Sequence, residues 1–385
     1  MPDRPEQDTT PPFLPYGKQE ISDADIKAVI EALCSGWLTT GPRVSEFENA
    51  FAGWCGAGHG VAVNSGTAAL HAAMRAIQLK PGEEVIVPAI TFAASANAAV
   101  YEGGVPVFAD VEPDSLLIDP ASVARKITPN TRAIVAVDYA GQPADYDALR
   151  ALAMDRNIAL IADACHAPGA TYKGRNAGTL ADISCFSFHP VKHLTTCEGG
   201  MALTDDADMA AHMRRFRNHG IDSDHRSREK SGTFAYDMRE LGYNYRLPDV
   251  QCALGLAQLA RLSGWVAARQ RIAGLYDQAL ASVALVTPLK THKDRAHAYH
   301  LYVVKLADEI DRDRVFTQLR TQGIGANVHY APVHLHSFYR QRGYGEGTAP
   351  IAESVSKQLL TLPLFPAMAA ADVGRVVAAL GEAIS

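Results

Sequence analysis

The most telling part of the sequence is Phe186-Ser187-Phe188-His189-Pro190-Val191-Lys192-His193-Leu194-Thr195-Thr196, which Cys197 joins to Glu198-Gly199-Gly200. The run Ser184–Phe188 has the pattern of a buried strand, and a polar loop that carries a lysine follows it. A lysine amine can form a Schiff base with an aldehyde cofactor. The small residues Ser187, Gly199 and Gly200 let the backbone approach a phosphorylated ligand closely. The stretch therefore predicts that Lys192 binds pyridoxal phosphate.

Short apolar runs alternate with longer helical patterns from about residue 58 to residue 204. This alternation predicts an α/β fold with a mostly parallel, seven-stranded sheet and crossover helices. Helices are expected at Thr67–Ile77 and Asp147–Asp155. The expected strands are Gly60–Val63, Glu84–Val87, Pro106–Asp110, Ala133–Val137, Ala159–Asp163, Ser184–Phe188 and Met201–Thr204.

Three of the expected strands end at a polar residue that opens a loop. Asn64-Ser65 follows the first strand, Asp163 ends the fifth, and Ser187 lies near the end of the sixth. Ligands of open α/β sheets bind outside the carboxyl ends of the strands. We therefore expect these three loops to lie on one rim of the sheet.

The chain has 385 residues, more than one hydrophobic core usually supports, so we expect two domains. A large domain would span residues 1–248, with an N-terminal arm at 1–22, and a smaller α+β domain would span 249–385. The elements expected in the smaller domain are a long helix from Pro248-Asp249, a strand at Tyr299–Leu306, a helix at Asp311–Gln322, a strand at Ala326–Tyr330 and a final helix with Val373, Val376, Val377, Leu380 and Ile384.

Composition argues against several classes of partner. The formal net charge is -6 and no lysine- or arginine-rich block is present, which argues against nucleic acid. The six cysteines form no CxxC pair and no zinc-type spacing, so we expect reduced thiols and no metal site. No apolar run approaches the roughly 20 residues that span a membrane, and the N-terminus lacks a signal-peptide pattern. The sequence predicts a soluble, cytoplasmic protein.

The run Asn64-Ser65-Gly66-Thr67 is the candidate phosphate site. It follows a strand and opens a helix, so free N–H groups and the positive helix end point at the rim. Gly66 and Thr67 are the expected donors. The alternative is a plain strand–turn–helix connection in which Ser65 is only the N-cap.

Asp163, His166 and Phe92 are candidates for the cofactor ring. A carboxylate at the end of an apolar strand is costly without a partner, and a protonated pyridine nitrogen would be such a partner for Asp163. His166 could reach the ring hydroxyl, and Phe92 could stack on the ring. The alternatives are that Asp163 caps a following helix, that His166 is a capping or core histidine, and that Phe92 is a core residue.

From Tyr16 to the C-terminal helix, the chain resembles the DegT/DnrJ/StrS family of sugar aminotransferases, a branch of the aspartate-aminotransferase-like (fold type I) pyridoxal enzymes. The matching motifs are Gly36-Trp37-Leu38-Thr39-Thr40-Gly41, Asn64-Ser65-Gly66-Thr67-Ala68, Pro88-Ala89-Ile90-Thr91-Phe92, Asp163-Ala164-Cys165-His166-Ala167, Ser187-Phe188-His189-Pro190-Val191-Lys192, Gly242-Tyr243-Asn244-Tyr245-Arg246-Leu247 and Val328-His329-Tyr330. In the sugar-deoxygenating members a histidine replaces the lysine, so the resemblance with Lys192 present favours amino transfer.

The resemblance implies a role for each candidate. Lys192 would be the Schiff-base lysine and proton shuttle, and Asp163 would pair with the pyridine nitrogen. Ser187 and the Gly66-Thr67 amides would hold the phosphate, and Phe92 would cover the ring. Asn244 would reach the phosphate of the neighbouring subunit's cofactor, which implies a homodimer with shared active sites.

The resemblance also implies the reaction. L-Glutamate would give its amino group to the cofactor, leaving 2-oxoglutarate and pyridoxamine phosphate, and a keto sugar nucleotide would then accept it. The chain is most similar to the aminotransferases of the pseudaminic acid pathway, which act at C4 of a UDP-linked 4-keto-6-deoxy-N-acetylhexosamine. The segments that carry this likeness are Val137–Gly141, Tyr299–Tyr302 and Asn327–His334.

The same likeness implies a substrate pocket. Its expected lining residues are Tyr16, Gly36, Trp37, Leu38, Thr39, Asn327, Val328, His329 and Tyr330. The alternative for Tyr299–Tyr302 and for His329 is packing at the domain interface. Two other functions stay open: a GDP-perosamine or dTDP-sugar type of aminotransferase acting at C4 or C3, and a non-catalytic regulatory or binding protein.

Overall fold

The central sheet of the computed structural model, which describes residues 12–154, 156–223, 228–229 and 231–385, has the order β1-β9-β8-β5-β4-β2-β3. Its strands are β1 (His59–Val63), β2 (Glu84–Pro88), β3 (Val105–Ala109), β4 (Thr131–Val137), β5 (Ala159–Asp163), β8 (Ile183–Ser187) and β9 (Gly200–Thr204). Strand β9 runs antiparallel to both β1 and β8, and the other neighbouring pairs are parallel. The predicted mostly parallel, seven-stranded sheet is confirmed.

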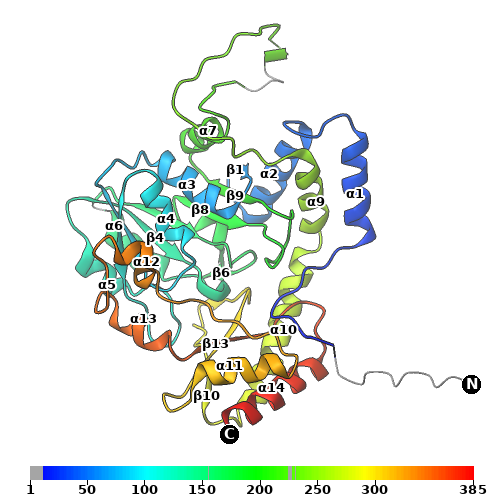
Figure 1. Cartoon of the computed structure of the whole chain (residues 1–385). Coiled ribbons are helices and arrows are strands. Elements are labelled where there is room, and N and C mark those ends of the chain that lie inside the picture. The colour runs from blue at the N-terminus through cyan, green and yellow to red at the C-terminus, as the bar shows by residue number, and fades with distance from the viewer. Residues whose placement is uncertain (1–11, 155, 224–227, 230) are drawn as a thin grey trace, which may run out of the picture.

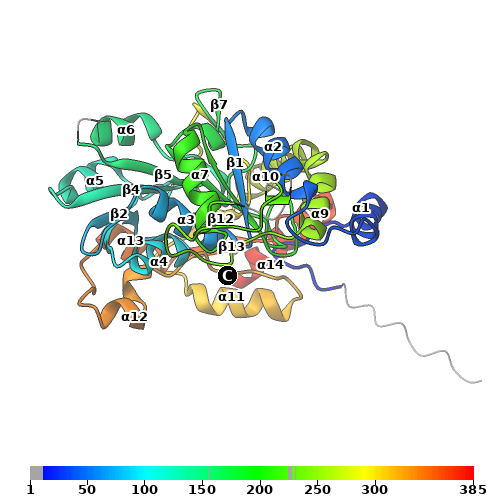
Figure 2. The same cartoon turned by 90° about the horizontal axis from the view of Figure 1, so that it is seen from above.

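Helices cover both faces of this sheet because its strands are apolar on both sides (Figures 1 and 2). Val61 and Val63 of β1 pack with one layer, and Ala62 between them packs with the other. The first layer contains α3 (Gly66–Ala76), α4 (Ala94–Tyr101) and α7 (Ala207–Phe216). The second contains α2 (Pro42–Cys55), α5 (Pro120–Lys126) and α6 (Tyr146–Met154), and α1 (Asp23–Cys34) packs outside α2 against α9 (Asp249–Leu259).

The C-terminal part of the chain builds a smaller unit below the sheet in Figure 1. Its antiparallel sheet has the order β10-β12-β13, formed by β10 (Val286–Pro288), β12 (Tyr302–Leu306) and β13 (Leu359–Leu362). Its helices are α11 (Arg312–Thr321) and α14 (Ala370–Ile384), whereas α12 (Ser337–Arg340) and α13 (Pro350–Val355) pack against the first helix layer of the large sheet. A third small sheet joins β11 (Arg295–Ala296), β6 (Thr171–Tyr172) and β7 (Arg175–Asn176).

Helix α10 (Leu262–Leu280) connects the second helix layer of the large sheet to the core of the smaller unit. Trp265 and Val266 belong to the core beneath the large sheet, whereas Ile272 and Tyr276 belong to the core of the smaller unit. Between these pairs, the buried Arg269 guanidinium donates to the carbonyls of residues 299, 300 and 364 at 3.1–3.3 Å. The domain division at residue 248 stays a prediction.

Two of the expected strands are absent or shortened in the structure, and one expected helix has other bounds. The strand expected at Ala326–Tyr330 is wrong, because Asn327 forms only one bridge, to Thr361, before the chain turns away from the sheet. The strand expected from Tyr299 begins only at Tyr302, because Tyr299 has a positive φ of 50° that interrupts extended pairing. The expected helix Asp147–Asp155 begins at Tyr146, and Asp155 lies outside the described residues.

Candidate active site

The three loops predicted to share a rim do so. Strands β1, β5 and β8 run in the same direction, because β9 is antiparallel to both β1 and β8, and β5 is parallel to β8. Their carboxyl ends therefore place Asn64-Ser65, Asp163 and Ser187 at one edge of the sheet. This edge is where an open α/β sheet binds its ligand.

The start of helix α3 has free N–H groups that a ligand could reach. Ser65 is the N-cap and accepts the Ala68 N–H at 3.1 Å, as the alternative interpretation predicts. Helix geometry leaves the N–H groups of Gly66 and Thr67 without an intrahelical acceptor. A methyl group on Gly66 would lie 2.8 Å from the Ser187 Cβ, so the helix start and the end of β8 are packed together. Ser65 can therefore cap the helix while the N–H groups of Gly66 and Thr67 stay available beside Ser187.

Asp163 is buried and already has two partners. Its carboxylate accepts the Ser95 hydroxyl at 2.6 Å and the Cys165 N–H at 3.3 Å, and the Ser95 oxygen lies 2.7 Å from the Thr91 hydroxyl. A carboxylate offers about four acceptor positions, so capacity for another donor remains. The alternative that Asp163 caps a following helix is wrong, because residues 164–170 form turns.

Lys192 lies in a turn after β8, where its N–H donates to the His189 carbonyl. The Lys192 Nζ is 3.4 Å from the Nε2 of His300. Burial lowers the pKa of the Lys192 amine below its ordinary value, and nearby Cys165 and Asp163 act in the opposite direction. A lowered pKa makes this amine a better base near neutral pH.

His166 and Phe92 both lie near Tyr330. The His166 ring is buried, with its Nε2 3.3 Å from the Tyr330 hydroxyl and its Nδ1 without a partner among the described residues. Burial first, and then the charge of Lys192, lowers the pKa of His166 well below its ordinary value. Phe92 is 59% exposed, so the alternative of a core residue is wrong. Its ring lies 6.1 Å from the Tyr330 ring.

Part of the expected substrate pocket also meets at this rim. The Tyr16 ring lies 5.5 Å from the His329 ring, and the Tyr330 ring lies 6.1 Å from that of Phe92 and 6.5 Å from that of Tyr139. The Tyr139 hydroxyl donates to the His329 carbonyl. His329 also bonds through Nδ1 to the Thr361 hydroxyl at 2.9 Å, which is the interface packing that the alternative predicts. The N-terminal arm and residues 327–330 therefore reach the cofactor candidates.

The remaining predicted residues lie on other elements. Gly36–Thr39 follows α1, where the Leu38 carbonyl accepts the Asp249 N–H at 3.0 Å. Asn244 is exposed, and its carbonyl accepts the Asn64 side chain at 3.5 Å. Asn244 thus lies beside the strand end that leads to Gly66, with its side chain exposed.

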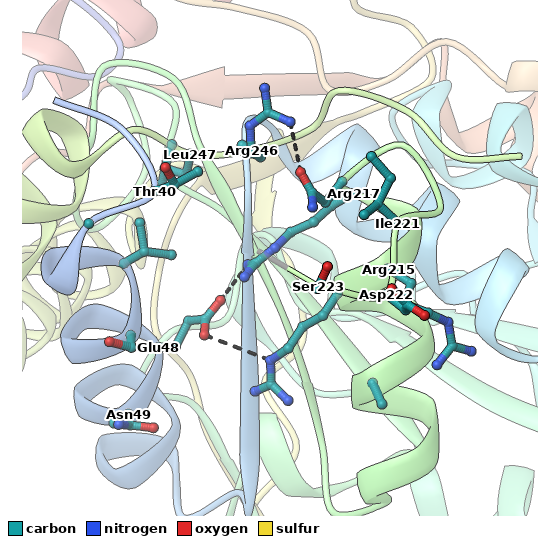
Figure 3. Close-up of a pocket in the computed structure, with 16 residues that line it drawn as sticks. Thr40, Glu48, Asn49, Arg215, Arg217, Ile221, Asp222, Ser223, Arg246 and Leu247 are labelled. Carbon is teal, nitrogen blue, oxygen red and sulfur yellow. Dashed lines mark hydrogen bonds and ion pairs between the residues drawn. The ribbon is translucent and has the colours of Figure 1, made fainter. Parts of the chain in front are cut away.

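A cavity of about 560 Å³ lies between α2 and the segment that follows α7 (Figure 3). Glu48 points into it and accepts Arg217, while Arg214 lies 3.9 Å from the same carboxylate. On the other side, Arg246 donates to the Asn218 amide oxygen at 2.9 Å. None of the predicted site residues lines this cavity.

Sequence reasoning gave no role to Ser95, Tyr139 or His300. Ser95 lies 68 positions from the carboxylate that it binds, and no spacing signals such a contact. Tyr139 and His300 lie in the segments Val137–Gly141 and Tyr299–Tyr302, whose likeness to the family was the available signal.

The residues at this rim fit pyridoxal phosphate. The donor cluster at Gly66 and Ser187 suits a phosphate, and the buried carboxylate of Asp163 suits a cationic ring nitrogen. The unpartnered Nδ1 of His166 leaves a polar atom for a further ring substituent. A family model, the DegT/DnrJ/EryC1/StrS aminotransferase family, matches residues 19–381. The chain belongs to this family.

Individual relatives agree with this membership. The chain is 41% identical over 379 residues to the spore coat polysaccharide biosynthesis protein SpsC of Bacillus subtilis (strain 168), covering 97% of each chain. It is 30% identical to PseC of Helicobacter pylori, with a TM-score of 0.91 over 97% of this chain and 99% of PseC. It is also 30% identical to Spr1654 of Streptococcus pneumoniae in its PMP form, with a TM-score of 0.91 over 96% and 98%.

This family member is a sugar aminotransferase that depends on pyridoxal phosphate. The finding excludes the alternative of a non-catalytic regulatory or binding protein. Within the described part of the chain, no helix combines the length and the apolar character that crossing a membrane requires.

Proposed function

We propose that this aminotransferase moves an amino group from L-glutamate to C4 of a UDP-linked 4-keto-6-deoxy-N-acetylhexosamine, as in pseudaminic acid biosynthesis. The observation that supports this substrate is the likeness to PseC, described as an aminotransferase involved in the biosynthesis of pseudoaminic acid, over almost the full length of both chains. The nearest alternative is another nucleotide-linked keto sugar, acted on at C4 or C3. The 41% identity to SpsC, a spore coat polysaccharide protein, favours that alternative.

Lys192 is the residue that we assign to proton transfer. Bound pyridoxal phosphate supplies an aldehyde for amino exchange and a ring that accepts electrons. Lys192 would attach to that aldehyde and, when released, take a proton from the α-carbon of glutamate with its Nζ. Its lowered pKa supports this role, because only the neutral amine can act as a base.

The other residues would hold the cofactor. Gly66, Thr67 and Ser187 would bind the phosphate, and Asp163 would pair with the ring nitrogen while Ser95 fixes its orientation. His166 would bind the ring hydroxyl, and Phe92 would cover the ring. Tyr16, Gly36–Thr39 and Asn327–Tyr330 would line the sugar-nucleotide pocket.

A homodimer with shared active sites is part of the proposal. The segment that follows α7 extends away from the rest of the molecule in Figure 1, and Asn244 lies in its returning part, in a bridge with Asn218. Its described residues expose large apolar side chains, with Phe234 at 95% and Leu241 at 72%. Helix α1 exposes Ile26, Ile30 and Leu33. Apolar surfaces of this kind are typical of protein interfaces, and a second copy would bury them while receiving Asn244.

An absorbance titration of the holoenzyme tests the substrate. L-Glutamate should bleach the colour of the bound cofactor, and, after removal of excess glutamate, the correct keto sugar should restore it. The sugars to compare are UDP-4-keto-6-deoxy-L-N-acetylaltrosamine and the GDP- and dTDP-linked 4-keto and 3-keto sugars. Recovery with the UDP sugar alone supports the proposal. Recovery with a GDP or dTDP sugar, or with a 3-keto sugar, would show that this sugar is the substrate instead. The assignment of the protein as an aminotransferase would stand.

A further inference from the structure

Three buried histidines surround Lys192, and each belongs to a different part of the chain. The rings of His166 and His300 lie 4.3 Å apart, and those of His193 and His300 lie 5.7 Å apart. His166 bonds through Nε2 to the Tyr330 hydroxyl, and His193 bonds through Nε2 to the Ala298 carbonyl at 2.9 Å. Of these rings, only His300 directs its Nε2 at Lys192.

The backbone around His300 is held from two sides. Gly141 has a φ of 108°, and a side chain there would lie 2.8 Å from the Tyr299 nitrogen and 3.0 Å from the His300 nitrogen. Only glycine permits this close approach of the two segments. On the other side, Arg269 donates to the His300 carbonyl at 3.3 Å, and the Leu301 N–H donates to the Ala140 carbonyl at 3.2 Å. The backbone that carries the His300 ring is therefore held in place, and the contact of His193 Nε2 with the Ala298 carbonyl links this loop to the Lys192 turn.

The His300 ring is a neutral partner. Burial first, and then the positive charge of Lys192, lowers the pKa of His300 well below its ordinary value, with His166, His193 and Arg269 acting in the same direction. A carboxylate at this place would raise the pKa of the lysine and keep its amine protonated. A neutral imidazole can bind the amine without that effect.

We propose that His300 is a positioning residue, which holds the Nζ of Lys192 by a hydrogen bond whenever the amine is not attached to the cofactor. A lysine side chain has four rotatable bonds, and loss of a fixed partner would spread the amine over many positions. The proton transfer needs the amine at hydrogen-bond distance from the reacting carbon. The inference rests on the proposed role of Lys192 as the base.

Three substitutions of one residue test the inference. His300→Leu keeps the volume and removes the polar atom. His300→Asn is polar but too short to reach Lys192. His300→Gln carries a polar atom at about the reach of Nε2, so it should restore the contact. The matched control is His297→Asn, in the same loop, where the His297 Nδ1 accepts the Tyr299 N–H and the amide oxygen of asparagine can replace it.

The measurement is the glutamate half-reaction of each holoenzyme in a single turnover, with ordinary and α-deuterated glutamate. His300→Leu and His300→Asn should slow it about tenfold or more, because one oriented proton-transfer contact is lost. The deuterium isotope effect should increase, and the glutamate concentration for half-maximal rate should stay within about twofold, because His300 contacts the lysine and not the substrate. His300→Gln and His297→Asn should stay within about threefold of the wild-type rate.

Equal rates and isotope effects for His300→Asn and His300→Gln would overturn the inference, and this pair decides the test even if His300→Leu does not fold. A parallel Lys192→Ala variant separates this result from the proposed function. If Lys192→Ala loses turnover while His300→Asn keeps it, the role of His300 fails alone. If Lys192→Ala keeps its turnover, the role of Lys192 as the base fails.

Discussion

The two parts of the proposed site differ in what surrounds them. Lys192, Asp163 and His166 lie at the sheet rim, where buried partners from the same chain fix each polar group. Asn244 lies where the protruding segment returns to the body of the molecule, in a bridge with Asn218, and that segment exposes apolar side chains. The first part is complete within one chain, and the second has a surface that one chain leaves uncovered. Under the proposed homodimer, the first part would form when one chain folds, and the second part would form only when two chains associate.

The largest expected effect tests the part within one chain. Lys192→Ala should slow the glutamate half-reaction by about 10⁴-fold, because general-base catalysis contributes up to that factor. In the wild type, the rate should rise with pH and level off below pH 10.5, the ordinary pKa of lysine, because burial favours the neutral amine. Stopped-flow absorbance over a pH series measures both. The control is Lys173→Ala at an exposed ion pair, and substantial turnover in Lys192→Ala would contradict the assignment.

A smaller effect is expected at the ring nitrogen. Asp163→Asn should lower turnover about 100-fold, because a neutral amide cannot keep the ring nitrogen protonated. Ser95→Ala leaves the carboxylate charge and removes one hydrogen bond, so a loss of about tenfold is expected. Steady-state rates with saturating glutamate check the order. An equal loss in both variants would mean that orientation of the carboxylate, and not its charge, controls the ring.

The next prediction addresses association directly. Asn244→Asp places a negative charge toward a phosphate and should weaken cofactor binding about tenfold. At a cofactor concentration that leaves most Asn244→Asp sites empty, co-expressed Lys192→Ala and Asn244→Asp subunits should recover roughly a quarter of the wild-type activity, because half of the dimers are mixed and each has one intact site. Lys192→Ala with Asp163→Asn should stay at about 1% of the wild-type activity or below, because mixed dimers then have no intact site. Absence of recovery in the first pair would place Asn244 in the site of its own chain.

The smallest expected effect separates capping from phosphate binding. Ser65→Ala removes the N-cap of α3 and should lower the free energy of unfolding by about 1 kcal/mol. Turnover and cofactor affinity should stay close to the wild type, because the proposed donors are Gly66, Thr67 and Ser187. Thermal unfolding and cofactor titration check the two parts. Ser45→Ala, at an exposed position in α2, is the control, and a large loss of cofactor affinity in Ser65→Ala would place its hydroxyl at the phosphate.

The sheet was predictable because its strands carry a simple signal. Buried parallel strands are apolar on both faces, so runs such as Ala159–Asp163 stand out, and the structure places that strand at the predicted bounds. The signal fails where a segment is extended but unpaired. Ala326–Tyr330 alternates like a strand, yet its backbone makes only one bridge, from Asn327 to Thr361, and forms no strand. Periodicity reports exposure of side chains and does not report pairing of the backbone.

Positions of the candidate site were predictable where the residue type has few other uses in that local structure. A lysine in a strand-end loop and a glycine at a helix start are such positions, and both lie at the rim. Ser95 and His300 were not predictable, because serine in a helix and histidine near a strand have many ordinary uses. Their importance comes from contacts across 68 and 108 residues of sequence. Only the tertiary structure brings these partners together.

Helix α10 has a mechanical consequence for ligand binding. At 19 residues it is a rod of roughly 28 Å, and it is packed at one end into the large core and at the other into the small one. A hinge inside it would have to break backbone hydrogen bonds and the three contacts of Arg269. The two units therefore resist separate rotation along this helix. We therefore expect loops and side chains, such as the exposed ring of Phe92, to move when a ligand binds. We do not expect the smaller unit to rotate as a whole.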